Sequence, residues 1–234
     1  MTRETYHHDI IQGTPEWHEL RRGIITASIA SSLVTPTGKV ANNDTVRKLA
    51  YQMAAERITG RVEKTFVSYD MERGNIEEVF ARELYGKTYT SIQSPLAECG
   101  FIETSLLGFR VGYSPDGLVG DDGLIEIKSR MPKYQIQTIC SQEVPGEYMM
   151  QMQFGLWITC RKWIDFIQYS NGMHMYVHSV TPNAETFKII EEAVTAFEKR
   201  VNDIIDDYKT KSVSFPVAEY IQHIDGSEIE VNDD

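Results

Sequence analysis

Two carboxylates and one amine lie close together in the middle of this sequence. Asp116 belongs to the run Ser-Pro-Asp-Gly at 114–117, and Glu126 and Lys128 belong to Gly-Leu-Ile-Glu-Ile-Lys at 123–128. Successive side chains of a β-strand point to opposite faces, so Glu126 and Lys128 should share one face about 7 Å apart, with the neighbouring isoleucines on the other. The pattern predicts a strand with one chemical face and one core face.

A turn signal lies between Asp116 and this strand. The tract Asp-Asp-Gly at 121–123 would fold the chain back as a hairpin and bring Asp116 close to Glu126. Two such carboxylates suit Mg²⁺, which takes one or two carboxylates at about 2.1 Å and keeps positions open for water and a phosphate. Lys128 would add positive charge beside an attacking water. The alternative is an ordinary hairpin with a surface Glu-Lys pair, which the flanking isoleucines disfavour because they indicate a half-buried strand.

Length and composition indicate a globular protein. With 234 residues, 41% of them hydrophobic and 24% charged, the chain is expected to form a single domain over 1–234, with an acidic and disordered tail at 221–234. No run is apolar enough to cross a bilayer and the start is polar, so a cytoplasmic protein without a membrane partner is expected. The three cysteines, an odd number at wide spacings, are interpreted as small core residues rather than as a disulfide, zinc or iron–sulfur framework.

The net charge of −11 does not exclude a nucleic-acid partner. Acidic residues are concentrated late in the chain, whereas basic residues are frequent early and around the predicted hairpin. Because the local field decides where an anion binds, an acidic exterior with a basic channel would guide DNA to one place.

The order of predicted elements indicates an α/β or α+β fold, a sheet with helices packed against it. Capping residues, glycines and apolar periodicity predict helices at 16–21, 27–33, 44–59, 72–85, 132–141, 145–160 and 184–208. Alternating short runs predict an antiparallel meander of strands at 96–103, 109–113, 118–119 and 124–128, followed by strands at 163–169 and 173–180.

Four motifs in order resemble one family. They are Trp-His-x-Leu-Arg-x-Gly-x-Ile-Thr-Ala-Ser at 17–28, Gly-x-x-x-Glu at 74–78, Ser-Pro-Asp-Gly with Glu-x-Lys at 114–128, and Tyr-Met-x-Gln-x-Gln at 148–153 with Trp157. Each is weak alone, but together they resemble the lambda-exonuclease and YqaJ-type viral recombinase nucleases of the PD-(D/E)xK superfamily. The resemblance implies a restriction-endonuclease-like core with a central mixed sheet flanked by helices.

The resemblance also implies a metal site. In such nucleases Asp116, Glu126 and the backbone carbonyl of Ile127 would bind Mg²⁺, for which Mn²⁺ would substitute. Glu78 would support the metal, through water or directly; Glu77 is its competitor, although the Gly-x-x-x-Glu spacing selects Glu78. The alternative for Glu78 is an exposed helix carboxylate paired with the arginine four residues later.

Further roles follow from the same motifs. Lys128 would activate or orient the nucleophilic water, and Gln151 would hold that water or the scissile phosphate. Tyr148 and Gln153 would contact the DNA.

Arg21 and Ser28 match residues that form a pocket for a 5′-terminal phosphate in this family. A guanidinium can fork onto phosphate oxygens, and a hydroxyl in the first turn of a helix adds donors. The alternatives are a helix-surface arginine and a plain capping serine. Arg22 follows directly, which leaves open which arginine would reach the phosphate.

These expectations combine into one function. The family resemblance implies a Mg²⁺-dependent 5′→3′ exodeoxyribonuclease that acts on linear double-stranded DNA and leaves 3′ single-stranded overhangs for phage-type recombination. It also implies a phage or prophage origin, a ring-shaped homotrimer and a single-strand annealing protein as partner. The alternatives are an endonuclease of restriction or repair type and a non-catalytic DNA-binding module on the same fold.

Overall fold

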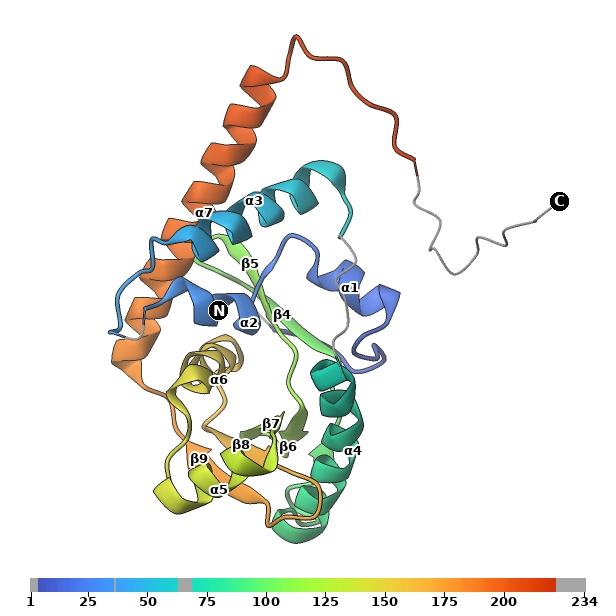
Figure 1. Ribbon diagram of the computed structural model, residues 1–234, viewed down its shortest axis with the longest axis vertical. Helices are drawn as coiled ribbons and strands as arrows, with labels where there is room; N and C mark the ends of the chain where they lie inside the picture. Colours follow the sequence, from blue (N-terminus) through green and yellow to red (C-terminus); the bar gives the residue numbers. More distant parts are fainter. Residues whose placement is uncertain (1–3, 36, 63–68, 222–234) are drawn as a thin grey trace, which may run out of the picture.

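Two mixed β-sheets and the helices around them form the protein (Figure 1). The computed structural model describes residues 4–35, 37–62 and 69–221. The predicted acidic tail therefore lies, from residue 222 onward, outside the described residues. Within the described ranges, none of the helices has the length and apolar character needed to span a bilayer.

The first sheet joins the N-terminal region to the middle of the chain. Its strands lie in the order β1 (Thr5–His7), β4 (Phe101–Leu106), β5 (Phe109–Tyr113) and β2 (Ile25–Thr26). β4 pairs antiparallel with β1 and β5, whereas β2 runs parallel to β5. A two-residue turn with positive φ at both positions, 55° and 83°, joins β4 to β5, which is the geometry that suits a tight hairpin.

The second sheet carries the predicted hairpin. Its order is β3 (Leu96–Ala97), β6 (Gly117–Val119), β7 (Gly123–Ser129), β8 (Trp163–Tyr169) and β9 (Tyr176–Val180). β7 and β8 are parallel and the other neighbours are antiparallel. β6 and β7 form the hairpin around the Asp-Asp-Gly turn, so this part of the sequence prediction is confirmed.

Seven helices surround the sheets in the described part of the chain. They are α1 (Pro15–Arg21), α2 (Ala27–Leu33), α3 (Asp44–Thr59), α4 (Tyr69–Tyr89), α5 (Pro132–Ser141), α6 (Gly146–Thr159) and α7 (Ala184–Lys211). Thr14, Asn43 and Asn183 cap α1, α3 and α7, each accepting a backbone N–H three residues on. α4 packs on β7 and β8, while α6 packs against both sheets and against α2 and α7.

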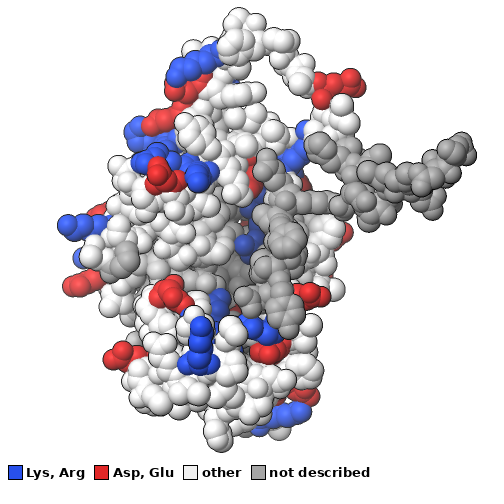
Figure 2. Space-filling model, viewed as in Figure 1, with Lys and Arg blue, Asp and Glu red and all other residues white. Residues whose placement is uncertain are grey.

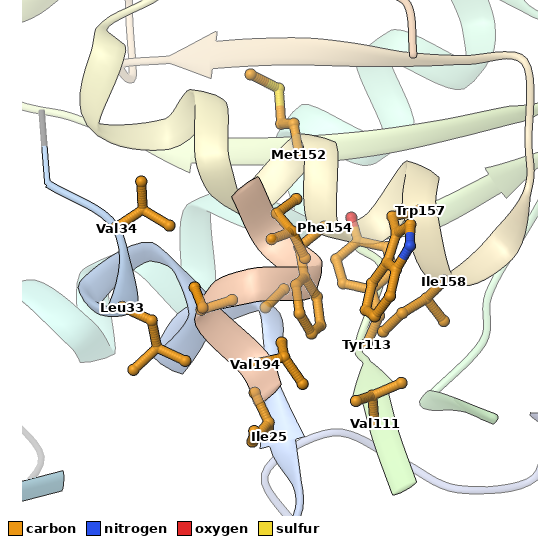
Figure 3. Packing of buried hydrophobic residues seen from close by; sticks show 14 of the residues in the cluster. Ile25, Leu33, Val34, Val111, Tyr113, Met152, Phe154, Trp157, Ile158 and Val194 are labelled. Atoms are coloured by element: carbon orange, nitrogen blue, oxygen red, sulfur yellow. The ribbon is translucent and has the colours of Figure 1, made fainter. Parts of the chain in front are cut away.

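The buried side chains form two clusters, one on each face of β7. Ile125 and Ile127 point to α4 and pack with Ala81 and Tyr85. The alternate face belongs to the larger cluster, which fills the space between the two sheets, α2, α6 and α7. Figure 3 shows Phe154 of α6 in this cluster, together with side chains of β2, β5 and α7. Glu126 and Lys128 therefore lie opposite the two isoleucines as predicted, but their face is also part of the core, because Leu124 on that face belongs to the larger cluster.

The predicted meander is wrong. The run 96–103 is not one strand, because it breaks before Phe101 into β3 and β4, which belong to different sheets. A Cβ at Gly100 would lie 2.0 Å from the carbonyl oxygen of Ile10, so the chain crosses the N-terminal segment there at a distance that only glycine allows. The two- and three-residue strands β2 and β1 carry no alternation long enough to predict.

Two smaller expectations are corrected. The helix predicted over 72–85 extends to Tyr89, because Gly86 packs against Leu96 instead of ending the helix. Of the three cysteines, Cys99 is buried, but Cys140 and Cys160 are exposed at helix ends.

Candidate active site

Asp116 lies where the chain leaves β5 and enters β6. The pairing of Gly117 with Ile125 sets Asp116 beside the end of β7. Its Oδ2 accepts the backbone N–H of Ile127 at 2.5 Å. The hairpin thus brings the first carboxylate to the strand that carries the second.

Glu126 is buried, with 1% of its surface exposed, and its charge is matched by donors from three elements. Tyr113, at the end of β5, donates its hydroxyl to Oε2 at 2.9 Å. Gln151 of α6 and Lys128 of β7 both approach Oε1, with Nε2 at 2.5 Å and Nζ at 2.7 Å. Burial of a carboxylate without such partners would destabilise the fold by roughly several kcal/mol, and the three donors offset this cost.

α4 contributes a third carboxylate through Glu78. This side chain forms an ion pair with Arg82 one turn later, and Arg82 Nε also donates to the backbone carbonyl oxygen of Asp116 at 2.8 Å. The neighbouring Glu77 is oriented differently and accepts the Ser129 hydroxyl at 2.6 Å. The charge of Glu78 acts on Asp116, which favours Glu78 over Glu77 as the helix-borne member of the cluster.

Three carboxylates lie close together where little water reaches them, and this explains the pKa shifts in the cluster. Burial, with the charges of Glu126 and Glu78, raises the pKa of Asp116 well above its usual range. Burial also raises the pKa of Glu78, with Arg82 opposing it. Burial alone would lower the pKa of Lys128, but the negative charges of Glu126 and Asp116 outweigh it and raise that pKa, so Lys128 is held as a cation.

This donor set fits a hard divalent cation. Carboxylate and carbonyl oxygens are the ligands that Mg²⁺ takes, and a cation among Asp116, Glu126 and Glu78 would relieve the repulsion that raises the pKa of Asp116. In the residues that the structure describes, no group of three or more His, Cys, Asp or Glu side chains is already arranged around one point as metal ligands. The Glu126 oxygens accept from Tyr113, Gln151 and Lys128, which hold this carboxylate in place.

Arg21 lies close to this cluster through Ser114. Its NH1 donates to the Ser114 hydroxyl at 2.8 Å, two residues before Asp116. The guanidinium also stacks over the ring of Trp17, 3.9 Å from the centroid. Burial lowers the pKa of Arg21 to about 10, partly opposed by the charge of Glu56. A half-buried guanidinium of this kind is a good receptor for a phosphate.

Ser28 lies at the same end of the first sheet. It is exposed in the first turn of α2, with its Oγ 3.1 Å from Oγ1 of Thr26. β2 and β5 are parallel with Thr26 opposite Gly112, so two residues further on Ser28 and Ser114 lie beyond the same sheet edge. Arg22, the competitor of Arg21, instead pairs with Glu19 and donates to the Gly60 carbonyl at 2.9 Å. This arrangement favours Arg21.

The two DNA contacts predicted on α6 are placed differently. Tyr148 stacks on Phe166, with centroids 5.6 Å apart, and Lys128 Nζ lies 5.3 Å from its ring. Gln153 is 3% exposed and its amide is used by the chain itself: Nε2 donates to the Thr181 carbonyl at 2.8 Å and Oε1 accepts from Asn183 at 2.9 Å. Gln153 therefore lies outside the cluster and does not fit the predicted role.

Several residues of the site were not singled out from the sequence. Trp17, interpreted as a core residue, donates its indole N–H to Ser114 and to the Gly100 carbonyl, each at 3.0 Å. Its place in the same motif as Arg21 was the available signal. Tyr113 gave no comparable signal, because a strand tyrosine is common and only the tertiary fold turns it toward the carboxylates. Arg82 was expected only as the helix partner of Glu78, a pair that the structure contains, and its bond to the Asp116 carbonyl gave no signal in the sequence.

Comparison with known proteins agrees with this geometry. The YqaJ-like viral recombinase domain matches residues 16–162. An alkaline exonuclease from Laribacter hongkongensis is similar in structure, with 29% identity, a TM-score of 0.74 and coverage of 85% of this chain and 98% of that one. Its complex with dAMP gives 30% identity and the same TM-score and coverage.

A phage-related exonuclease from Haemophilus somnus shares the fold at 15% identity, with a TM-score of 0.51 and coverage of 79% of this chain and 96% of that one. No curated protein matches the chain. The family match covers more than half of the sequence and contains the whole carboxylate cluster. The chain therefore belongs to the YqaJ-like viral recombinase family, as a nuclease of the phage-recombination type.

Proposed function

We propose that this protein is a Mg²⁺-dependent 5′→3′ exodeoxyribonuclease that digests one strand of linear double-stranded DNA and leaves 3′ single-stranded overhangs. The observation that carries the proposal is the connected set of Asp116, Glu126 and Lys128, joined through Ser114 to the half-buried cation Arg21. Such a set combines a phosphodiester-cleaving centre with a receptor for a terminal phosphate.

The residues divide the chemistry among them. Asp116, Glu126 and the carbonyl of Ile127 would hold the Mg²⁺, with Glu78 acting through water; the ion supplies a Lewis acid for the phosphate oxygens when it is bound. Mn²⁺ would substitute. Lys128, held as a cation by its acidic neighbours, donates to the attacking water or the phosphate and offsets the negative charge that develops during hydrolysis.

The neighbouring donors keep these groups in position. Tyr113 and Gln151 donate to the two oxygens of Glu126, from β5 and α6. This leaves Glu126 little freedom to rotate when Lys128 turns from its oxygen toward a substrate. Orientation of this kind lowers the barrier because the reacting groups need not be ordered during the reaction.

The end specificity would come from Arg21 with Ser28. A 5′-phosphate bound there lies next to the loop that carries Asp116, so the first phosphodiester after the end would reach the carboxylates. We propose in addition that the protein assembles as a homotrimeric ring around the duplex and passes the exposed strand to a single-strand annealing protein, both as in related nucleases of this type.

The decisive assay compares linear duplexes that carry a 5′-phosphate or a 5′-hydroxyl, labelled at the 3′ end of the same strand, with and without Mg²⁺. We expect the phosphorylated end to be degraded faster by about tenfold or more, since a charge-assisted phosphate contact contributes roughly 1.5–3 kcal/mol. In Arg21→Gln this preference should disappear. Equal wild-type rates on both ends would refute the assigned roles of Arg21 and Ser28, and cleavage of covalently closed circles would indicate an endonuclease.

The role of Lys128 is tested by Lys128→Ala. We expect kcat to fall by about 10²–10³-fold, the usual effect of removing one donor to developing charge, while DNA binding in Ca²⁺ is retained. Lys162→Ala serves as the control, since that lysine is exposed and pairs with Asp122 on the surface. Full activity of Lys128→Ala would remove this residue from the mechanism.

A further inference from the structure

A row of alternating cations and aromatic rings leads away from Lys128. Lys128 Nζ lies 5.3 Å from the Tyr148 ring, and the guanidinium of Arg130 lies 5.4 Å from the same ring. Arg130 also lies 4.4 Å from the ring of Tyr134, and Lys133 Nζ lies 4.8 Å from that ring. These five side chains, called the basic row below, form a continuous series from the end of β7 to the first turn of α5 and the start of α6.

The basic row leads from the interior to the surface. The side chain of Lys128 is 25% exposed and that of Arg130 18%, whereas Lys133 is an exposed residue. The first turn of α5 adds the positive end of a helix dipole at the same place. Figure 2 shows Lys and Arg side chains on one face of the molecule, with acidic side chains among them.

The neighbouring acidic charge does not cancel the basic row. Arg130 NH2 lies 3.1 Å from Glu147 Oε1, but the Glu147 side chain is 58% exposed. Because the Glu147 carboxylate lies largely in solvent, the pair is weaker than a buried one, so a phosphate could replace the carboxylate at small cost. Stacking over Tyr134 meanwhile limits the conformations of Arg130 and Lys133, which lowers the entropy that phosphate binding would cost.

We propose that the basic row binds the backbone of the DNA strand that enters the carboxylate cluster, with Arg130 and Lys133 contacting phosphates next to the one that is cleaved. This rests on the proposed nuclease function and extends it by a binding track. Lys128 lies at the inner end of the track, so a strand held by Arg130 and Lys133 would be directed toward the reacting groups. Rings beside basic side chains are typical of surfaces that bind nucleic-acid strands.

The test measures binding of a 5′-phosphorylated duplex by fluorescence anisotropy, with Ca²⁺ in place of Mg²⁺, over a series of KCl concentrations. We expect Arg130→Gln and Lys133→Gln each to weaken binding by roughly three- to tenfold and to make the slope of log K against log salt less negative by about 0.7–0.9. In Mg²⁺, both variants should raise KM by a larger factor than they lower kcat. Lys162 is exposed and directly precedes β8, so the control variant Lys162→Gln should leave the slope unchanged.

The rings are tested separately. Tyr134→Leu removes the ring beside Arg130 and Lys133, so it should weaken binding and be rescued by low salt. Because Lys133 is exposed, Lys133→Gln will fold, and its salt slope decides the matter even where an Arg130 or Tyr134 variant is unstable. Arg130→Lys, which keeps the charge, should recover most of the affinity lost in Arg130→Gln.

Two results would refute the proposed role of the basic row in DNA binding. One is a salt slope and affinity of the Arg130→Gln, Lys133→Gln double variant equal to those of the wild type. The other is a loss of kcat in these variants with unchanged binding, which would show that they act only through Tyr148 and Lys128. A protein that binds DNA with the expected slope but cleaves none would refute the proposed function and leave the basic row standing.

Discussion

At the scale of single residues, the cluster keeps negative charges closer together than water would favour. Asp116 is the most strongly affected, because it is half-buried and faces both Glu126 and Glu78. A carboxyl group whose pKa is raised on folding adds stability at acidic pH, below its unfolded pKa, and this stability is lost as pH rises through the folded pKa. The metal-free protein is therefore destabilised by Asp116 at neutral and alkaline pH.

We predict that Asp116→Asn stabilises the metal-free protein at pH 8, because burial and the charges of Glu126 and Glu78 raise the pKa of the Asp116 carboxyl well above its usual range, whereas asparagine carries no charge. The asparagine oxygen can still accept the Ile127 N–H. The gain should shrink as pH falls toward 4, and cleavage should be lost. Denaturant unfolding at several pH values, with the exposed Asp122→Asn as control, measures it. An equal free energy of unfolding at pH 8 would contradict the electrostatic account.

The sequence predicts site residues well where the spacing of those residues itself indicates their role. Asp116, Glu126 and Lys128 could be assembled from the turn signal and the two-residue period of a strand. Gln153 shows the limit: its spacing from Gln151 looks functional, but α6 turns it by about 200° away, into the loop that precedes α7. The helical period shows which residues share a face of a helix, but it does not show which other elements pack against that face.

At the scale of elements, α6 sets the distance between the sheets. It approaches β5 through Gly155, where a Cβ would lie 2.8 Å from two ring atoms of Tyr113. Tyr113 is fully buried and donates to Glu126, so it has little room to yield. The absence of one methyl group on α6 thus helps to keep Glu126 in place.

We predict that Gly155→Ala lowers the free energy of unfolding by about 1–3 kcal/mol, the usual cost of overpacking, and reduces the cleavage rate because Tyr113 shifts. Gly146→Ala is the matched control on the same helix, since a Cβ there meets nothing within 4 Å. That control should be neutral or up to about 1 kcal/mol more stable. Thermal unfolding and rate assays on both variants measure these effects; equal behaviour would mean that Tyr113 adapts without cost.

Elements were predicted from the sequence where their own residues define them. The helices with caps and the hairpin around 121–123 have such local signals. The separation of β3 from β4 has none, because it depends on the close crossing of Gly100 and Ile10, which are ninety residues apart. β1 and β2 similarly exist only because long-range partners complete them.

At the scale of the whole molecule, one ion pair connects distant parts of the chain. Arg57 of α3 donates two hydrogen bonds to Glu198 of α7, both at 2.7 Å, and a third to the Gly23 carbonyl at 2.9 Å. Glu198 is 2% exposed. α3, α7 and the segment after α1 are therefore fixed to one another through a single guanidinium, near the residues that lead to Ser28.

We predict that Glu198→Gln destabilises the protein by about 3–5 kcal/mol, because it leaves the charge of Arg57 without its buried partner. The neighbouring Lys199→Gln breaks an exposed pair with Asp203 and should change stability by less than about 1 kcal/mol. Urea unfolding of both variants provides the comparison. A small effect of Glu198→Gln would show that water or another group compensates Arg57.

The site described above draws on both sheets and on two helices. Asp116 and Tyr113 sit where one sheet passes into the other, while Gln151 comes from a helix made later in translation. A nascent chain that has emerged only as far as β7 holds the acids, Lys128 and Tyr113, but it lacks α6 and Gln151, so the donors around Glu126 are complete only once α6 has been made.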